Sequence, residues 1–188
     1  MNVIIFGPPL AGKGTQSKNI IENFGLTHLS TGDVLRAEKD KNSELGKKAE
    51  QYSKNGLLVP DDLVMKIVEN FYKLNIGKGL LFDGYPRNIK QAKHLLEFLN
   101  TDNNKIDLVI YLKVPKNILL ERAKKRALEE NRKDDADADT VITRINEFSK
   151  LTISAIEYIK DTGVKTVEID GTQTREDIFN EIIQILKK

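Results

Sequence analysis

The sequence predicts an α/β protein with a central parallel sheet of about five strands, flanked by helices. Short apolar runs of strand length alternate along the chain with longer segments whose apolar residues recur at helical spacing. This alternation is typical of parallel sheets that helices cover on both faces. The 188 residues suit one domain, and two polar stretches interrupt the alternation.

The expected elements follow from these runs. Strands are expected at Val3–Phe6, Leu80–Phe82, Leu108–Leu112 and Val164–Ile169, with a weaker one near Thr27–Leu29. Helices are expected at Gln16–Phe24, Asp61–Ile76, Asn88–Leu99, Pro115–Glu130, Asp139–Lys160 and Thr174–Lys187. Gly77 and Gly163 are interpreted as helix stops and Thr174 as an N-cap.

The two polar stretches are residues 30–59, which are rich in lysine, and residues 126–138, which are almost wholly charged or small. Neither contains enough large apolar residues to bury much surface. One interpretation is two solvated surface excursions. The other is two small mobile flaps of low local stability that close over substrates. On the second, residues 1–29, 60–125 and 139–188 form the core, 30–59 one flap and 126–138 a short lid.

The composition excludes several classes of protein. The chain has no cysteine, which excludes disulfide scaffolds, thiolate zinc sites and cysteine nucleophiles. A net charge of +2, no basic tail and 6% aromatic residues give little support for a nucleic-acid partner. No apolar run approaches the roughly 20 residues of a membrane span. We expect a soluble, cytoplasmic protein without membrane partners, and a monomer because no heptads are visible.

A phosphate-binding loop is predicted at Gly7–Thr15, which reads GPPLAGKGT between the first strand and the first helix. In such a loop the backbone N–H groups and the helix N-terminus attract anions, and Lys13 reaches the terminal phosphates. The general pattern places Ser or Thr directly after the lysine, whereas here Gly14 intervenes before Thr15. A strand-to-helix turn without a ligand is the alternative.

Residues suited to a second phosphate and a base follow. In Ser30–Arg36 (STGDVLR) a capped helix carries Arg36, which could fork onto a phosphate. Asp83 ends a strand, where ligands of open sheets gather, and it is either a magnesium-holding carboxylate or a turn residue. Arg87 follows a proline-stiffened turn. The amide of Gln91 can read the edge of a base, or it is simply exposed.

The arginines are few and cluster in motifs. The chain has 23 lysines and only seven arginines. Arg122 and Arg126 are four residues apart on one helix face, Arg132 lies in the charged stretch, and Arg144 lies in the next helix. Each alone could be a solvated surface residue. Together they suggest that arginine is used where a planar, forked donor is required.

These motifs resemble those of nucleoside monophosphate kinases, and of adenylate kinases in particular. The resemblance begins at GKGT and covers nearly the whole chain in order: STGDVLR, GLLVPD at Gly56–Asp61, FDGYPRN with Gln91, the arginine series and EIDGTQ at Glu168–Gln173. Six of the seven arginines, all but Arg175, fall on family motif positions. One departure is Leu10, where the family usually has glycine, which puts the loop geometry and the catalytic rate in question.

The resemblance implies a P-loop kinase fold and reversible, Mg²⁺-dependent transfer of the ATP γ-phosphoryl group to AMP, giving two ADP. It implies ATP contacts at Leu10, Ala11, Gly12, Lys13, Gly14, Thr15, Arg122, Arg126 and the backbone at Gln173. It implies AMP contacts at Thr31, Arg36, Leu57, Leu58, Val59, Gly84, Tyr85, Pro86, Arg87, Gln91, Arg132 and Arg144. The catalytic residues implied are Lys13, Arg87, Arg122, Arg132 and Arg144, and Asp83 would hold magnesium through water.

Alternatives remain open. A kinase directed at UMP or CMP is one, although Thr31 and Gln91 favour AMP because pyrimidine-directed relatives tend to carry Ala after the Ser. A nucleotide-binding regulatory module that has lost catalysis is another, encouraged only by Leu10.

No structural zinc is expected, because the long lid insertion of some relatives is missing. The acidic run of Asp134, Asp135, Asp137 and Asp139 is either a cation site or, as we favour, charges that stabilise the lid and a helix N-terminus. We expect His28 to be structural and His94 to be exposed.

Overall fold

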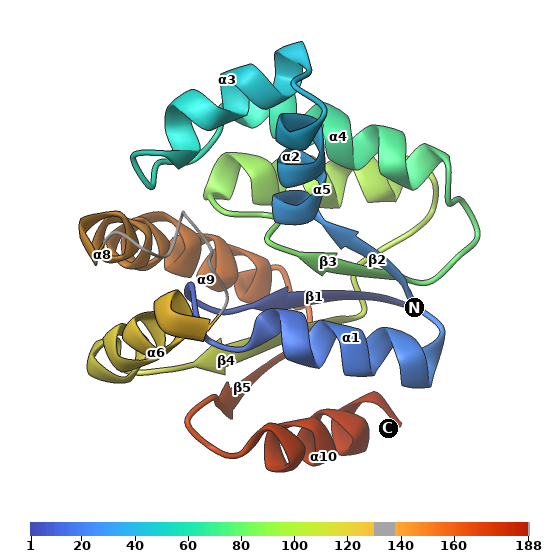
Figure 1. The fold of residues 1–188 in the computed structure, drawn as a ribbon. Coiled ribbons are helices and arrows are strands. Elements are labelled where there is room, and N and C mark those ends of the chain that lie inside the picture. Colours follow the sequence, from blue (N-terminus) through green and yellow to red (C-terminus); the bar gives the residue numbers. More distant parts are fainter. Residues whose placement is uncertain (130–137, 188) are drawn as a thin grey trace.

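Five parallel strands form one sheet in the order β2–β3–β1–β4–β5 (Figure 1). The computed structural model describes residues 1–129 and 138–187, the side chains of 126–129 excepted. The strands are β1 Asn2–Phe6, β2 Thr27–Ser30, β3 Leu80–Asp83, β4 Leu108–Lys113 and β5 Thr166–Asp170. The predicted five-stranded parallel sheet is confirmed, including the weakly signalled strand at Thr27.

The helices follow the strands much as the sequence predicts, although α3 was not predicted and two other helices differ from expectation. They are α1 Lys13–Phe24, α2 Thr31–Asp40, α3 Glu44–Ser53, α4 Asp61–Lys73, α5 Ile89–Thr101, α6 Lys116–Glu129, α8 Ala138–Glu147, α9 Ile153–Asp161 and α10 Arg175–Leu186, with a π-helical turn, η1, at Phe148–Thr152 between α8 and α9. Thr174 caps α10, as predicted, by accepting the N–H of Asp177. Gly163 follows the end of α9.

The predicted end of α4 is wrong, and the predicted helix over 139–160 has nearly the right bounds but contains a π-helical turn. The α4 helix ends at Lys73 rather than Ile76, because the Asn75 side chain donates to the Phe71 carbonyl that a continuing helix would use. Within the predicted single helix over 139–160, the turn η1 is π-helical. In this turn the Ser149 hydroxyl donates a hydrogen bond of 3.0 Å to the carbonyl of Ile145.

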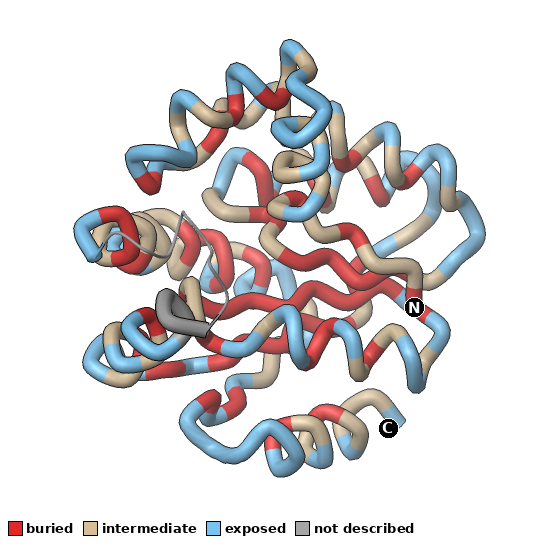
Figure 2. The backbone as a smooth tube through the Cα atoms, viewed as in Figure 1, coloured by how far each residue is buried: buried red, intermediate tan, exposed pale blue. Residues whose placement is uncertain are grey.

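The sheet separates two apolar clusters, as its alternating side chains require. Its central strands are coloured as buried in Figure 2. From β1, Ile4 and Phe6 enter the cluster that the buried faces of α4, α5 and α9 complete. Val3 and Ile5 enter the opposite cluster, which includes residues of α1, α6, α8 and α10. The central strands β1, β3 and β4 are therefore buried on both faces, whereas the edge strands β2 and β5 are partly exposed.

Residues 30–59 form two helices, α2 and α3, which lie at one end of the molecule beside α4 (Figure 1). Ser30 and Ser43 cap them by accepting N–H groups of Asp33 and Gly46. Only Thr31, Gly46, Ala49, Gly56 and Val59 of this stretch are buried, so it buries as little as its composition predicts. Most of the stretch 126–138 lies outside the described residues. Within the part that is described, no helix is long and apolar enough to cross a membrane.

A glycine sets the distance between α2 and α3. A Cβ added at Gly46 would lie 2.3 Å from the Glu38 carbonyl oxygen, so no side chain fits there without moving the backbone. We predict that G46A lowers the free energy of unfolding by about 2 kcal/mol or more, as overpacking does. K48A, at an exposed position of the same helix, serves as the control and leaves stability within about 0.5 kcal/mol. Urea unfolding measures both, and equal stabilities of G46A and wild type would contradict the packing described.

Candidate active site

The loop between β1 and α1 has the geometry of an anion cradle. Gly12 caps α1 with φ 95°, and the Ala11 N–H donates to the Pro8 carbonyl at 3.2 Å, which closes a turn. Lys13 Nζ donates to the carbonyls of Gly7 at 2.8 Å and Pro8 at 3.2 Å, so the ammonium group is held over the loop. The N-terminus of α1 and this ammonium group give the loop a positive potential.

Leu10 adopts a left-handed backbone conformation, with φ 70°. A non-glycine residue there costs about 1–2 kcal/mol. The side chain packs against the cluster that contains Val3 and Ile5, and the Leu10 carbonyl accepts a hydrogen bond from Arg122 Nη1 at 3.2 Å. The conformation that glycine favours is thus preserved with leucine present, and these contacts offset its strain.

Arg122 links two loops at the carboxyl edge of the sheet. Besides the Leu10 carbonyl, it donates through Nη2 to the carbonyl of Gly171 at 2.8 Å. The forked guanidinium of α6 thereby joins the loop after β1 to the loop after β5. Gln173 lies in that second loop and is exposed, its amide 3.4 Å from Glu181. Thr15 is also exposed.

Asp83 is buried at the end of β3, with 8% of its surface exposed. The Ser17 hydroxyl donates to its Oδ2 at 3.1 Å, and His28 Nε2 lies 3.5 Å from the same oxygen. Burial acts to raise the pKa of Asp83, but His28, the charge of Lys13 and the Ser17 hydroxyl outweigh it and hold the pKa below its usual value. Asp83 is therefore a carboxylate at neutral pH, close to the positive loop.

Thr31, Gly84 and Arg87 form a compact corner just after β3. The Thr31 hydroxyl and Arg87 Nε both donate to the Gly84 carbonyl, at 2.9 and 2.7 Å. Gly84 has φ 80°, and a Cβ there would lie 3.0 Å from both Thr31 Oγ1 and an Arg87 nitrogen. Only glycine permits this turn, and the turn directs Arg87 along the edge of the sheet.

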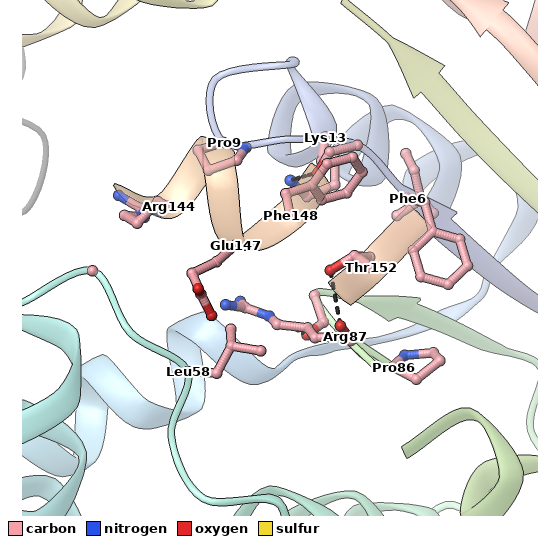
Figure 3. Close-up of a pocket in the computed structure, with 14 residues that line it drawn as sticks. Phe6, Pro9, Lys13, Leu58, Pro86, Arg87, Arg144, Glu147, Phe148 and Thr152 are labelled. Carbon is pink, nitrogen blue, oxygen red and sulfur yellow. Dashed lines mark hydrogen bonds between the residues drawn. The ribbon is translucent and has the colours of Figure 1, made fainter. Parts of the chain in front are cut away.

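A cavity brings the two halves of the site together (Figure 3). Its lining includes Gly7, Pro9 and Lys13 from the loop after β1, and Gly84, Pro86 and Arg87 from the loop after β3. Leu58 and Arg144 line it as well. The Thr152 hydroxyl of η1 donates to the Arg87 carbonyl at 2.9 Å, which ties η1 to this wall.

Three basic residues, Lys13, Arg87 and Arg144, line this cavity with one carboxylate, that of Glu147. Burial, helped by the neighbouring guanidiniums of Arg144 and Arg36, lowers the pKa of Arg87 to about 10, against the opposing effect of Asp83. Arg87 stays charged at neutral pH, and the mutual repulsion of the guanidiniums raises the free energy of the ligand-free site. An anion placed between them would relieve that repulsion.

Other predicted site residues do not face this cavity in the structure. Tyr85 is fully buried, and its hydroxyl contacts the Gln91 carbonyl at 3.2 Å and His94 Nδ1 at 3.1 Å. Val59 belongs to the core, and Leu57 is exposed. Arg36 pairs with Asp33 on α2.

Some predicted residues lie outside the described part of the chain. These are Arg132, the side chain of Arg126, Asp134, Asp135 and Asp137. Asp139 is described and lies in the first turn of α8.

The expectation that His94 is exposed is wrong. His94 Nε2 lies 2.8 Å from Glu69 on α4, its ring stacks on Phe98, and its side chain is 21% exposed. Sequence spacing gave no sign of this contact, because it joins two helices that are close only in the fold.

His28 was expected to be structural. In the structure its Nε2 lies 3.5 Å from Oδ2 of Asp83, so it also contacts a residue of the site. Phe148 and Thr152 also line the cavity, and both belong to η1, a π-helical turn that the sequence analysis did not predict.

Within the described residues, no group of three or more His, Asp or Glu side chains is arranged to hold a metal ion. This leaves Asp83 as a single carboxylate beside the phosphate loop. A single carboxylate suits an ion that retains most of its water and is held chiefly by substrate phosphates.

The fold and this site define a P-loop nucleotide-binding protein: a parallel sheet, an anion-binding loop after β1 and an ionised Asp at the end of the adjacent strand. A family model described as adenylate kinase matches residues 5–164. The chain belongs to the adenylate kinase family.

Individual relatives agree over the full length. The adenylate kinase of Phocaeicola vulgatus is 40% identical over 189 residues, covering 100% of this chain and 99% of its own. That of Bacteroides fragilis (strain ATCC 25285) is 42% identical, covering 97% and 96%. That of Methanosarcina barkeri is 38% identical over 214 residues, covering 100% and 99%.

The charge in the cavity generates a prediction for anion binding. Inorganic pyrophosphate should raise the melting temperature of the wild type, because it relieves the repulsion around Arg87. R87M should lose most of this shift, whereas R175M, which removes an exposed arginine at the start of α10, should keep it. Differential scanning fluorimetry at fixed ionic strength measures the three shifts. Equal shifts for wild type and R87M would place the anion elsewhere.

Proposed function

We propose that the protein catalyses the reversible transfer of the γ-phosphoryl group of ATP to AMP, giving two ADP, and so balances adenine nucleotides. The observation that carries the proposal is the shared cavity, in which Lys13 from the phosphate loop and Arg87 from the loop after β3 line one space. The names of the relatives support the same reaction.

The donor is assigned to the loop after β1. In this proposal the loop amides of Leu10–Thr15 and Lys13 hold the β- and γ-phosphates, and the backbone near Gln173 borders the adenine. Arg122, which already joins these two loops, and Arg126 close over the transferring group. Phosphoryl transfer depends mainly on positioning and on neutralising charge, which backbone amides and an ammonium group supply.

The acceptor is assigned to the other side of the cavity. Arg87 and Arg36 hold the AMP phosphate, Thr31, residues 57–59, Gly84–Pro86 and Gln91 hold the nucleoside, and Arg132 and Arg144 close over the transferring group. A phosphate monoester is largely dianionic near neutral pH, since its second pKa is about 6. It therefore needs no general base, and the one carboxylate that lines the cavity, Glu147, is assigned no such role.

Magnesium fits this arrangement. The ionised Asp83 lies at the end of β3 beside Ser17 and within the field of Lys13, where its carboxylate would hold the water shell of the ion. When bound, Mg²⁺ would neutralise charge on the donor phosphates. Asp83 itself forms and breaks no covalent bond in this proposal. Its role is to orient the hydrated ion.

Two segments of the protein are proposed to move during the reaction. Residues 30–59 act as the monophosphate flap and 126–138 as a short lid, and both close over the core to exclude water, which would otherwise hydrolyse ATP. The low burial of 30–59 supports this assignment. We also propose that the protein acts as a cytoplasmic monomer, which size-exclusion chromatography with light scattering tests for the oligomeric state.

One assay tests the function. ADP formation from ATP is measured with AMP, CMP, UMP and GMP in turn, with and without magnesium. We expect Mg²⁺-dependent turnover with AMP as the best acceptor. Preference for UMP or CMP would favour a pyrimidine-directed kinase instead. Binding of ATP and AMP without ADP formation would indicate a regulatory module.

Lys13 provides the sharpest single variant. We predict that K13M lowers kcat for ADP formation at least about 100-fold, the loss expected when one key electrostatic donor is removed. K18M, at an exposed position of the same helix, should retain wild-type turnover. Circular dichroism checks that both variants are folded. Near-normal turnover by K13M would remove Lys13 from the mechanism.

A further inference from the structure

The side-chain amide of Gln91 is held in one orientation by groups of opposite kind. Its Oε1 accepts the backbone N–H of Arg87 at 2.8 Å, and its Nε2 donates to Asp61 Oδ1 at 2.7 Å. A backbone N–H can only donate, and a carboxylate can only accept. A flipped amide would face donor to donor at Arg87 and acceptor to acceptor at Asp61. The chemistry of the partners therefore fixes the orientation.

Asp61 also holds the chain on which Gln91 sits. The same Oδ1 accepts Asn88 Nδ2 at 2.8 Å, and Asn88 Oδ1 in turn accepts the Gln91 N–H at 2.9 Å as the cap of α5. From the other side, the Tyr85 hydroxyl donates to the Gln91 carbonyl at 3.2 Å. One carboxylate oxygen at the start of α4 thus anchors the first turn of α5 and sets the direction of the amide.

The amide keeps unused hydrogen-bonding capacity. A primary amide has two acceptor sites on oxygen and two N–H groups on nitrogen, so each of its two atoms retains one. Gln91 is 1% exposed here, so solvent does not compete for these sites, and a base reaches them only when the chain that covers them moves aside.

We propose that Asp61 is a specificity-determining positioning residue, which selects acceptor bases that carry an amino group beside a ring nitrogen without hydrogen. The inference rests on the proposed function and on Gln91 as the reader of the base. Adenine and cytosine present an amino donor, which suits the fixed Oε1, beside a ring acceptor, which suits Nε2. Guanine, uracil and hypoxanthine present a carbonyl oxygen and a ring N–H, the reverse pattern.

AMP and IMP form the matched pair of acceptors, because their bases share one purine shape and differ only at this edge. The readout is the ratio of kcat/KM for AMP to kcat/KM for IMP. D61S replaces the carboxylate by a shorter hydroxyl while leaving a residue suited to a helix start, and D61A removes every side-chain acceptor. We expect the ratio to fall about tenfold or more in either variant, mainly through a weaker AMP reaction.

Two controls separate positioning from general damage. D62S removes the neighbouring carboxylate, which is exposed and pairs only with Lys90 among the described residues, and should leave the ratio unchanged. D61N keeps an acceptor oxygen at this position and should retain most of the preference. Thermal melts establish that each variant is folded.

The outcomes are distinct. If a folded D61S or D61A slows AMP and IMP by the same factor, Asp61 is merely structural and the inference is overturned. If D62S changes the ratio as much as D61S does, the effect is one of charge, and the inference also fails. If the wild type phosphorylates neither acceptor, the proposed function fails first, and the failure does not bear on Asp61 alone.

Discussion

The parallel pairing of β1 with β3 is the constraint on which the site depends. Its register sets Ile5 opposite Asp83, so both strands end at the same edge of the sheet. The phosphate loop that follows β1 and the Asp83–Arg87 segment that follows β3 must therefore emerge side by side. Two segments more than 70 residues apart become one cavity because parallel strands place their carboxyl ends together.

The energetics of this edge are those of a site prepared for anions. The backbone at Leu10 is left-handed, and the charges of Arg144 and Arg36 act unfavourably on the buried guanidinium of Arg87. Both arrangements raise the free energy of the ligand-free protein, whereas the hydrogen bonds from Lys13 to the loop carbonyls lower it. The two covered apolar clusters on either side of the sheet supply the stability that tolerates it. A polyphosphate relieves the repulsion between the guanidiniums when it binds, and the same groups then stabilise the charge on a migrating phosphoryl group.

The strands and the phosphate loop could be predicted because the sequence signals for them are local. Continuous apolar runs identify strands buried on both faces, and a glycine- and lysine-containing turn after the first of them identifies the loop. The sequence analysis questioned the loop geometry at Leu10, where the family usually has glycine. The structure shows that this position does adopt a left-handed conformation, with φ 70°.

Long-range contacts carry no such signal. Nothing around His94 indicates Glu69 as its partner, and nothing near Gln91 indicates that Asp61, 30 residues earlier, accepts from its amide. The π-helical turn at 148–152 was also not predicted, because one inserted residue hardly changes the helical spacing of apolar residues. The roles assigned to Arg126 and Arg132 stay predictions, since the described structure does not include their side chains.

A crystal structure with two adenosines joined by five phosphates tests the central claim most directly. We expect the phosphate chain to lie along the edge where β1 and β3 end, with Lys13 Nζ and the Arg87 guanidinium within hydrogen-bond distance of its oxygens. A phosphate chain bound away from this edge, with Arg87 still directed at the Gly84 carbonyl alone, would contradict it.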